Sequence, residues 1–157
     1  MRVRTLSFFA CLVTVLSLAC APLAQADKLE TKYYTVDLSD TWQQLQNSDE
    51  DTLDIIVLAT KNRDCILTTI NGRSGGASLK TITQCFAQQY QSKGNPSVKS
   101  KLGSFTFKDV NGDDGIAYVT VQDQVYMVVT ISGNQRKGKS LLKNFSSDSF
   151  PDLVPSI

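Results

Sequence analysis

Histidine is absent from the 157 residues of this sequence. Without an imidazole, the chain cannot build a Ser-His-Asp or Cys-His catalytic centre or a histidine-containing zinc site. An enzyme made from these residues would depend on carboxylate pairs, lysine, tyrosine or thiol chemistry. The sequence shows no complete set of catalytic residues of any of these kinds. It therefore favours a non-enzymatic protein.

Long hydrophobic runs are also rare, and the longest uncharged one lies near the N-terminus. Residues 6–21 carry no charge, follow two arginines and precede the sequence Ala24-Gln25-Ala26. This pattern is typical of a secretory signal peptide cleaved after Ala26. The run is shorter than the ~20 apolar residues that span a bilayer. A lipoprotein cleaved before Cys20 is the alternative, and in either case we expect a periplasmic protein.

Removal of residues 1–26 leaves residues 27–157, which is the length of a single domain. Acidic residues are missing from one part of it: residues 27–64 hold nine acidic and four basic residues, whereas residues 65–108 hold six basic residues and no acidic one. The nearly equal numbers of acidic and basic residues do not indicate binding to nucleic acid. We interpret the basic block as solvated side chains, with an acidic partner as the alternative. Its members are Arg73, Lys80, Lys93, Lys99, Lys101 and Lys108.

Cysteine is scarce, and the part after residue 26 contains two, Cys65 and Cys85. Paired cysteines in an exported protein usually form a disulfide. The 19 intervening residues are too many for a redox Cys-x-x-Cys motif, and no histidine could complete a metal site. We therefore predict a structural disulfide, worth about 3 kcal/mol. Two buried free thiols are the alternative.

Hydrophobic periodicity predicts six strands and two helices. Alternating and β-branched residues place strands at 32–38, 52–60, 65–70, 104–110, 115–122 and 125–132. Ser78 is the expected N-cap of a helix that continues to about Lys93, and 140–145 is expected to form a short second helix. The long helix has one apolar stripe, made by Leu79, Ile82, Phe86 and Tyr90. The order βββ-α-βββ-α predicts an α+β domain with a mostly antiparallel six-stranded sheet.

This order resembles a known family. The opening strand leads to a tryptophan in "YYTVDLSDTW", two strands and a helix that starts with Ser and Leu follow, and three meandering strands precede a short helix. The pattern resembles the PsbP-like and DcrB-like fold family, which includes Ran-binding-factor-type domains, and the resemblance implies an exported bacterial member of that family. The resemblance covers about residues 30–146. It implies a binding or assembly module, and it supplies no catalytic residues.

Several residues are candidates for contact with a partner. The lone tryptophan, the acidic run "NSDED" and the arginine of "NGRSGG" are the sequence features best suited to a recognition surface. The candidate partner-binding residues are Trp42, Asp49, Glu50, Asp51 and Arg73. We interpret "NSDED" as a solvated loop and "NGRSGG" as a flexible connection into the helix. Asp109, Asn111 and Asp113 resemble the start of a calcium loop, but a tight hairpin explains them without metal.

Together these observations lead to a functional expectation. We expect a non-enzymatic periplasmic or envelope protein that acts through a protein partner, without cofactor or metal. A periplasmic immunity protein that inhibits a secreted toxin is one alternative. The other is a small hydrolase that uses acidic residues on cell-wall glycans, which would need two carboxylates facing each other in a groove.

Overall fold

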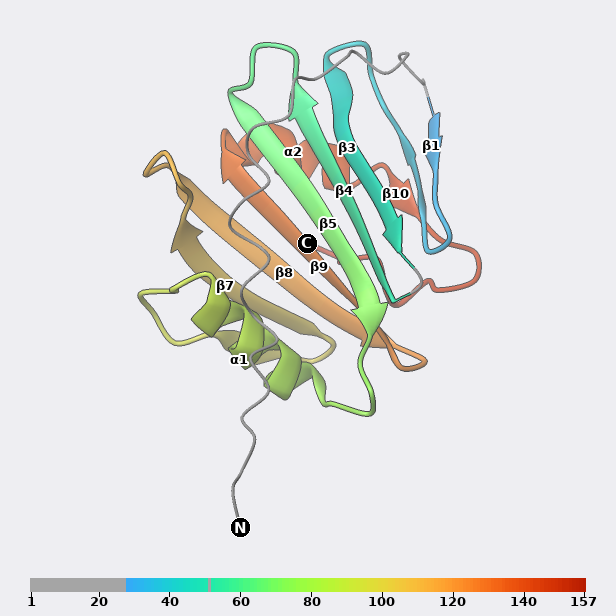
Figure 1. Ribbon diagram of the computed structural model, residues 1–157, viewed down its shortest axis with the longest axis vertical. Helices are drawn as coiled ribbons and strands as arrows, with labels where there is room; N and C mark the ends of the chain where they lie inside the picture. Colours follow the sequence, from blue (N-terminus) through green and yellow to red (C-terminus); the bar gives the residue numbers. More distant parts are fainter. Residues whose placement is uncertain (1–27, 51) are drawn as a thin grey trace.

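The computed structural model describes residues 28–50 and 52–157. Over these residues, a main sheet of seven antiparallel strands has the order β3-β4-β5-β9-β8-β7-β6 (Figure 1). Its strands are β3 (Trp42–Glu50), β4 (Leu53–Thr60), β5 (Cys65–Arg73), β6 (Ser97–Lys99), β7 (Leu102–Lys108), β8 (Asp114–Gln122) and β9 (Val125–Gly133). The predicted signal peptide, its cleavage after Ala26, the alternative anchor at Cys20 and residue Asp51 lie outside the described residues.

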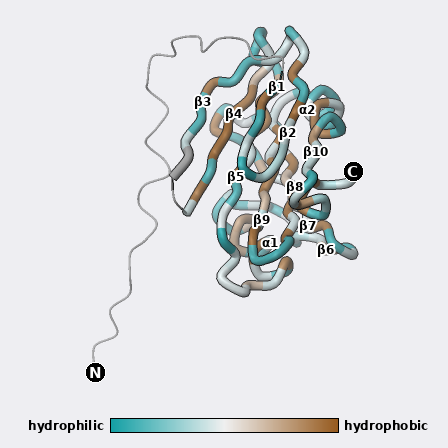
Figure 2. Tube along the Cα trace, turned by 90° about the vertical axis from the view of Figure 1, so that its right-hand side faces the viewer, coloured by the Kyte–Doolittle hydropathy of each residue, from teal (hydrophilic) through white to brown (hydrophobic). Residues whose placement is uncertain are grey.

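Different elements cover the two faces of the main sheet. A small sheet of β1 (Lys28–Glu30), β2 (Thr35–Asp37) and β10 (Phe145–Ser146) lies on one face together with α2 (Gln135–Leu142). The helix α1 (Leu79–Gln89) lies on the other face, mainly over β7 and β8. Figures 1 and 2 show α1 on the opposite side of the main sheet from α2 and the small sheet. We call these the α2 face and the α1 face.

Strand alternation sorts the core into two clusters, one on each face. The α2-face cluster contains Trp42, Leu58, Cys65, Leu67 and Met127, among others. The α1-face cluster is built around Phe105, Phe107 and Val128. No helix of the described residues is long and apolar enough to cross a membrane.

The structure confirms the α+β class and the mostly antiparallel sheet, and it corrects the number of strands. The predicted opening strand does not belong to the main sheet, because its centre forms β2 of the small sheet. Trp42 instead begins a nine-residue strand, β3, that pairs with β4 as far as Glu50. "NSDED" is therefore not a loop as a whole, since its first residues pair as strand.

The predicted start of α1 is confirmed, and its end comes earlier than expected. Ser78 is the N-cap, and its side chain accepts a hydrogen bond from the Thr81 N–H. The helix ends at Gln89 because Gln91 adopts a left-handed conformation with φ of 51°. Gln91 N then donates to Gln88 O and Ser92 N to Ala87 O, which is a Schellman motif without glycine.

Candidate functional site

The larger described cleft lies on the α2 face at one end of the main sheet. It has a volume of about 720 Å³. Three chain segments form its walls: the turn before β3, the turn between β4 and β5, and α2 with the residues after it. The lining residues are Ser39, Asp40, Thr41, Trp42, Thr60, Lys61, Asn62, Lys137, Ser140, Leu141 and Asn144. We refer to this space as the Trp42 cleft.

The Trp42 cleft combines an apolar floor with a polar rim. Trp42 and Leu141 line it and are 5% and 3% exposed, because both also pack in the α2-face core. Lys137 and Ser140, three residues apart on α2, and Asn144 just after the helix are exposed, so they form one polar edge of the cleft. A concave site with apolar walls and a few converging polar groups has the general form of a ligand- or peptide-binding site.

Hydrogen bonds fix the two turns against each other. Within the first turn, the Trp42 N–H donates to Ser39 O at 3.0 Å. The Lys61 N–H donates to Thr41 O at 2.9 Å, which joins the first turn to the second. The Cys65 N–H donates to Thr60 Oγ1 at 3.1 Å, and this bond closes the second turn. The backbone of these two walls of the cleft is therefore held in place by hydrogen bonds.

Asp64 connects the second turn to α2. Its carboxylate accepts a hydrogen bond from Thr60 Oγ1 at 2.8 Å and lies 2.6 Å from Lys137 Nζ. Its backbone carbonyl accepts from the N–H of Asn134, the N-cap residue of α2, at 2.8 Å. The hydrogen bond from Lys137, followed by the one from Thr60, holds the pKa of Asp64 below its ordinary value. One residue thus keeps two walls of the Trp42 cleft together.

This lowered pKa predicts an acid-dependent effect of Asp64→Asn. A carboxyl group with a depressed folded-state pKa stabilises the protein above the unfolded-state value of about 3.9. That stabilisation is lost as the pH falls through the folded-state pKa. We expect Asp64→Asn to melt below the parent protein at pH 7, and the difference to shrink below about pH 4. Melting temperatures across this pH range, with Lys137→Gln as a parallel variant, test it; a difference that stays constant with pH would contradict it.

The walls of the Trp42 cleft carry more positive than negative charge. From Asn134 to Asn144 the sequence has four basic residues and no acidic one. Arg136 and Lys143 lie four and three residues from Ser140, and both are exposed. Of the residues that line the cleft, Lys61 and Lys137 are cations and Asp40 is a carboxylate. Arg63, Arg136 and Lys143 are exposed in or beside the same segments without lining the cleft, and Asp64 is paired with Lys137.

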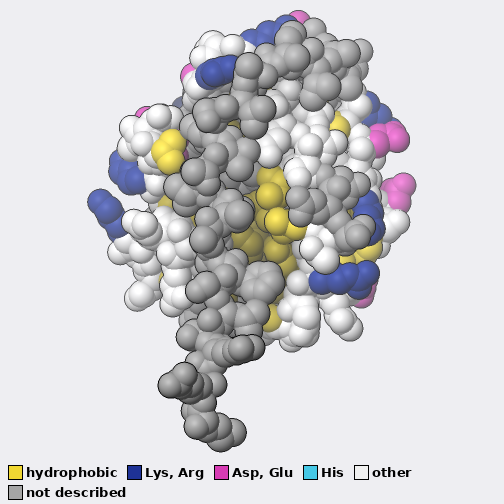
Figure 3. Space-filling view, in the orientation of Figure 1, with side chains coloured by type: hydrophobic (Ala, Val, Ile, Leu, Met, Phe, Trp, Pro, Cys, Tyr) yellow, Lys and Arg dark blue, Asp and Glu magenta, His cyan; other side chains and the backbone are white. Residues whose placement is uncertain are grey.

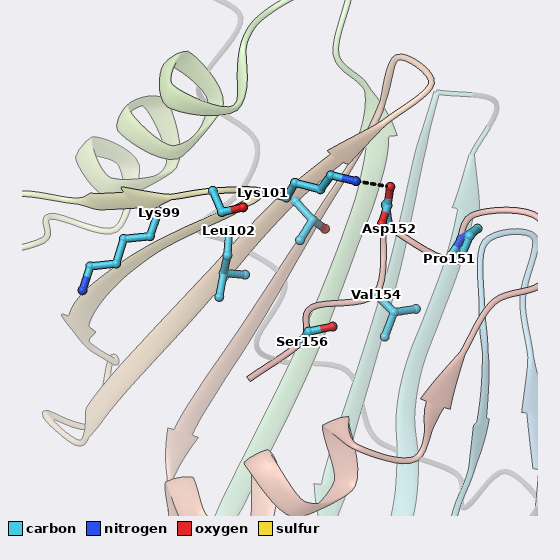
Figure 4. A pocket seen from close by; sticks show the side chains of 9 residues that line it. Lys99, Lys101, Leu102, Pro151, Asp152, Val154 and Ser156 are labelled. Carbon is cyan, nitrogen blue, oxygen red and sulfur yellow. Dashed lines mark hydrogen bonds and ion pairs between the residues drawn. The ribbon is translucent and has the colours of Figure 1, made fainter.

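A smaller described pocket lies where the C-terminal segment crosses the main sheet. It has a volume of about 330 Å³, and Figure 4 shows the side chains that line it. Lys101 Nζ lies 2.6 Å from Asp152 Oδ2, which is the carboxylate among the lining residues. Lys99 is a second cation among the lining residues, so this pocket differs from the Trp42 cleft mainly in its smaller volume.

The predicted partner-binding residues do not form one site. Trp42 begins β3 and lines the cleft, whereas Asp49 and Glu50 lie at the other end of the same strand. At about 3.3 Å per residue, these two ends are about 25 Å apart. Arg73 is exposed at the end of β5 and lies at the same end of the sheet as Glu50. Asp51 lies outside the described residues, as do the side chains of Asp49 and Glu50.

The basic block and the aspartate turn have structural explanations. Two of the six basic residues form ion pairs, Lys101 with Asp152 and Lys108 with Asp114. The Asp109 carboxylate accepts hydrogen bonds from Asn111 N and Asp113 N at 2.8 and 2.9 Å. This turn joins β7 to β8, as the hairpin interpretation predicts.

The predicted Cys65–Cys85 disulfide is absent, since both residues are free thiols. Cys65 is buried in the α2-face cluster, whereas Cys85 is exposed on α1, which covers the opposite face. Strand alternation explains the error. Cys65 points toward α2, so a helix on the other face cannot reach its sulfur. Burial raises the pKa of the Cys65 thiol to about 11 and leaves it largely protonated at neutral pH.

These positions predict unequal reactivity of the two thiols. Iodoacetamide applied to the native protein without reductant should label Cys85 rapidly, and Cys65 only after unfolding, because thiolate and access are both needed. Peptide mass mapping separates the two sites, since Arg73 and Lys80 place them in different tryptic peptides. If both sites stay unlabelled until reductant is added, the protein contains the bridge and the structure is wrong at this point.

Sequence reasoning missed the contribution of α2. The helix begins at Gln135, five residues before the predicted start at 140, so the run "QRKGK" is helical. Asn134 followed by this run was the available signal, because Asn is a strong N-cap residue. Gly138 interrupts the pattern; a Cβ there would collide with the Ile131 side chain, so glycine lets α2 lie close to β9.

Hydrophobic side chains also gather on the α1 face over β4 and β5. Ile55, Val57 and Ile66 are half-buried there, beside the part of the sheet that α1 covers. Figure 3 shows hydrophobic side chains at the centre of this face. The two faces thus differ: the α2 face is covered by described elements over β4 and β5, and no described helix covers the α1 face there.

The arrangement of layers defines the class of fold. A seven-stranded antiparallel sheet with α1 on one face and α2 on the other is an α+β protein with the PsbP-like fold, which confirms the predicted resemblance. The chain is similar to the solution structure of cyanobacterial PsbP (CyanoP) from Synechocystis sp. PCC 6803. The TM-score is 0.50 at 12% sequence identity, over 82% of this chain and 97% of that chain. This likeness shows the fold. No family model and no curated protein matches the chain.

Proposed function

We propose that this protein is an exported, non-enzymatic binding protein that holds a segment of a protein partner in the Trp42 cleft. The observation that carries the proposal is the cleft itself, with its apolar floor, polar rim and braced walls. The pattern of residues 1–26 supports export. The PsbP-like resemblance, which implies binding and assembly modules, agrees with it.

The residue types in the pockets favour binding over catalysis. The sequence has no histidine, and each described pocket is lined by one carboxylate, Asp40 in one and Asp152 in the other. A glycoside hydrolase that uses acidic residues needs two carboxylates facing each other across its groove. We therefore do not propose the hydrolase.

A periplasmic immunity protein is a narrower form of the same proposal. The excess of cations around the Trp42 cleft would complement a toxin whose active site is acidic. In that case the partner would be an enzyme, and binding would inhibit it. The general proposal does not depend on this version.

Site-specific photo-crosslinking in the producing cell tests the general proposal. A photoreactive phenylalanine analogue at Asn144, in the cleft wall, should crosslink a defined partner, whereas one at the exposed Thr106 of β7 should not. Ser140→Trp should block the cleft and abolish the Asn144 crosslink, while Gln84→Trp on the exposed side of α1 should not. A crosslink that persists in Ser140→Trp would place the partner elsewhere and refute the proposal.

A further inference from the structure

The charges around the Trp42 cleft identify the chemistry of its occupant. Lys61 and Lys137 line the cleft, and Arg136 on α2 and Lys143 at its C-cap are exposed four and three residues from Ser140. Lys137 is paired with Asp64 at 2.6 Å, so its charge is partly neutralised. Lys61, Arg136 and Lys143 form no ion pair within the described residues. Lys61 lines the cleft on one side, and Arg136 and Lys143 are exposed beside its α2 wall, while Asp40 is the one carboxylate among the lining residues.

We propose that the occupant is an acidic segment of a protein partner, which places an apolar side chain over Trp42 and Leu141 and its carboxylates on Lys61, Arg136 and Lys143. This inference rests on the proposed function and adds the chemistry of the partner. Opposite charges around an interface select the partner and accelerate association. The cleft volume of about 720 Å³ suits a short stretch of side chains rather than a single inorganic anion.

Other polyanions fit the surface less well. Single-stranded nucleic acid needs several aromatic platforms for successive bases, but Trp42 is the one aromatic residue among those that line the cleft. Binding to an anionic membrane by α2 would need large apolar side chains exposed beside the cations. The exposed large hydrophobic residues of the described chain are Val98, Val110 and Ile157, and none lies on α2. An acidic polypeptide uses both the cations and the apolar floor of the cleft.

The lone tryptophan supplies the means of measurement. Trp42 lines the cleft and is the single Trp of the chain, so its fluorescence reports occupancy of this site. The probe is a synthetic glutamate-rich peptide with one central leucine, and the matched probe replaces each glutamate with glutamine. We expect the acidic peptide to change Trp42 emission in a saturable way at low salt. Its affinity should fall as salt shortens the screening length from about 10 Å at 0.1 M to about 3 Å at 1 M.

Charge reversal separates the cleft cations from the general charge of the protein. The variant Lys61→Glu/Arg136→Glu/Lys143→Glu should bind the acidic peptide at least about tenfold more weakly, which corresponds to about 1.4 kcal/mol. The control Lys80→Glu/Lys93→Glu/Lys99→Glu makes the same net change at exposed positions near α1 and β6 and should stay within about twofold. Circular dichroism establishes that both variants are folded.

Each outcome decides the inference. Selective loss in the cleft variant supports it. Equal binding of the glutamate and glutamine peptides, equal loss in both variants, no binding of either peptide, or binding of anionic lipid vesicles in place of the peptide would each overturn it. The Asn144 crosslink is scored independently. If the inference is overturned but the Asn144 crosslink forms and depends on an open cleft, the proposed function stands and the partner has a different chemistry. If no such crosslink forms in the parent protein, both the proposed function and the inference are refuted.

Discussion

Gly133→Ala is expected to destabilise the protein by about 3 kcal/mol, combining left-handed backbone strain with a steric clash. Gly133 ends β9 with φ of 75°, a conformation that costs an L-residue about 1–2 kcal/mol. A Cβ at this position would also collide with the backbone carbonyl oxygen of Asp64. That carbonyl cannot rotate away without cost, because it accepts the Asn134 N–H that begins α2.

Thermal and urea unfolding measure this effect against two matched glycines. Gly112 has φ of 85° but open space around its Cβ position, so Gly112→Ala should cost only the strain, about 1 kcal/mol. Gly94 has open space and no left-handed φ, so Gly94→Ala should be neutral or stabilising by up to about 1 kcal/mol. For a domain of this size we expect Gly133→Ala to lower the melting temperature by about 10 °C.

The difference in stability loss between Gly133→Ala and Gly112→Ala measures the cost of the clash with the Asp64 carbonyl, because both variants share the left-handed backbone strain. If Gly133→Ala costs no more than Gly112→Ala, the turn from β9 into α2 can move away from Asp64, and the contact is not rigid. In that case the Trp42 cleft would also lose its fixed geometry, because Asp64 joins the turn between β4 and β5 to α2, and these two segments line the cleft. The stability series therefore also tests how firmly the candidate site is built.

Hydrophobic periodicity and residue composition predicted those helices and strands whose own sequences carry the signal. The stripe of Ile82 and Phe86 follows helical periodicity, and residues 52–60 and 125–132 have the β-branched composition of central strands; these elements were predicted nearly in full. By contrast, β3 reads "WQQLQNSDE", with two apolar residues in nine. It is an edge strand whose structure comes from pairing with β4, and that pairing is not encoded in its own alternation.

The Trp42 cleft could not be predicted for a related reason. Its walls come from residues 39–42, 60–62 and 137–144, and none of these segments alone has the pattern of a binding site. The failed disulfide has the same origin. The sequence placed Cys65 on the same strand face as Leu67, but it did not specify that α1 would cover the opposite face. Sequence separation describes the length of a loop, whereas the side of the sheet on which a helix packs depends on tertiary contacts.

The second large effect is expected from Leu67→Ala, which tests the assignment of the two faces. Leu67 is the third residue of β5 and is fully buried in the α2-face core. Removing its side chain should destabilise the protein by about 3–4 kcal/mol, through lost burial and the cavity left behind. The neighbour Ile66 points to the α1 face and is half-buried, so Ile66→Ala should cost about 1 kcal/mol.

Urea unfolding at constant m-value measures both variants, and the adjacent positions make them a matched pair on one strand. A large difference is expected because strand alternation places the two side chains in different environments. Losses of equal size would mean that the α1 face over β4 and β5 is covered as deeply as the α2 face. The apolar side chains visible there in Figure 3 would then be core rather than surface, and the two faces of the main sheet would not differ in how deeply they are covered.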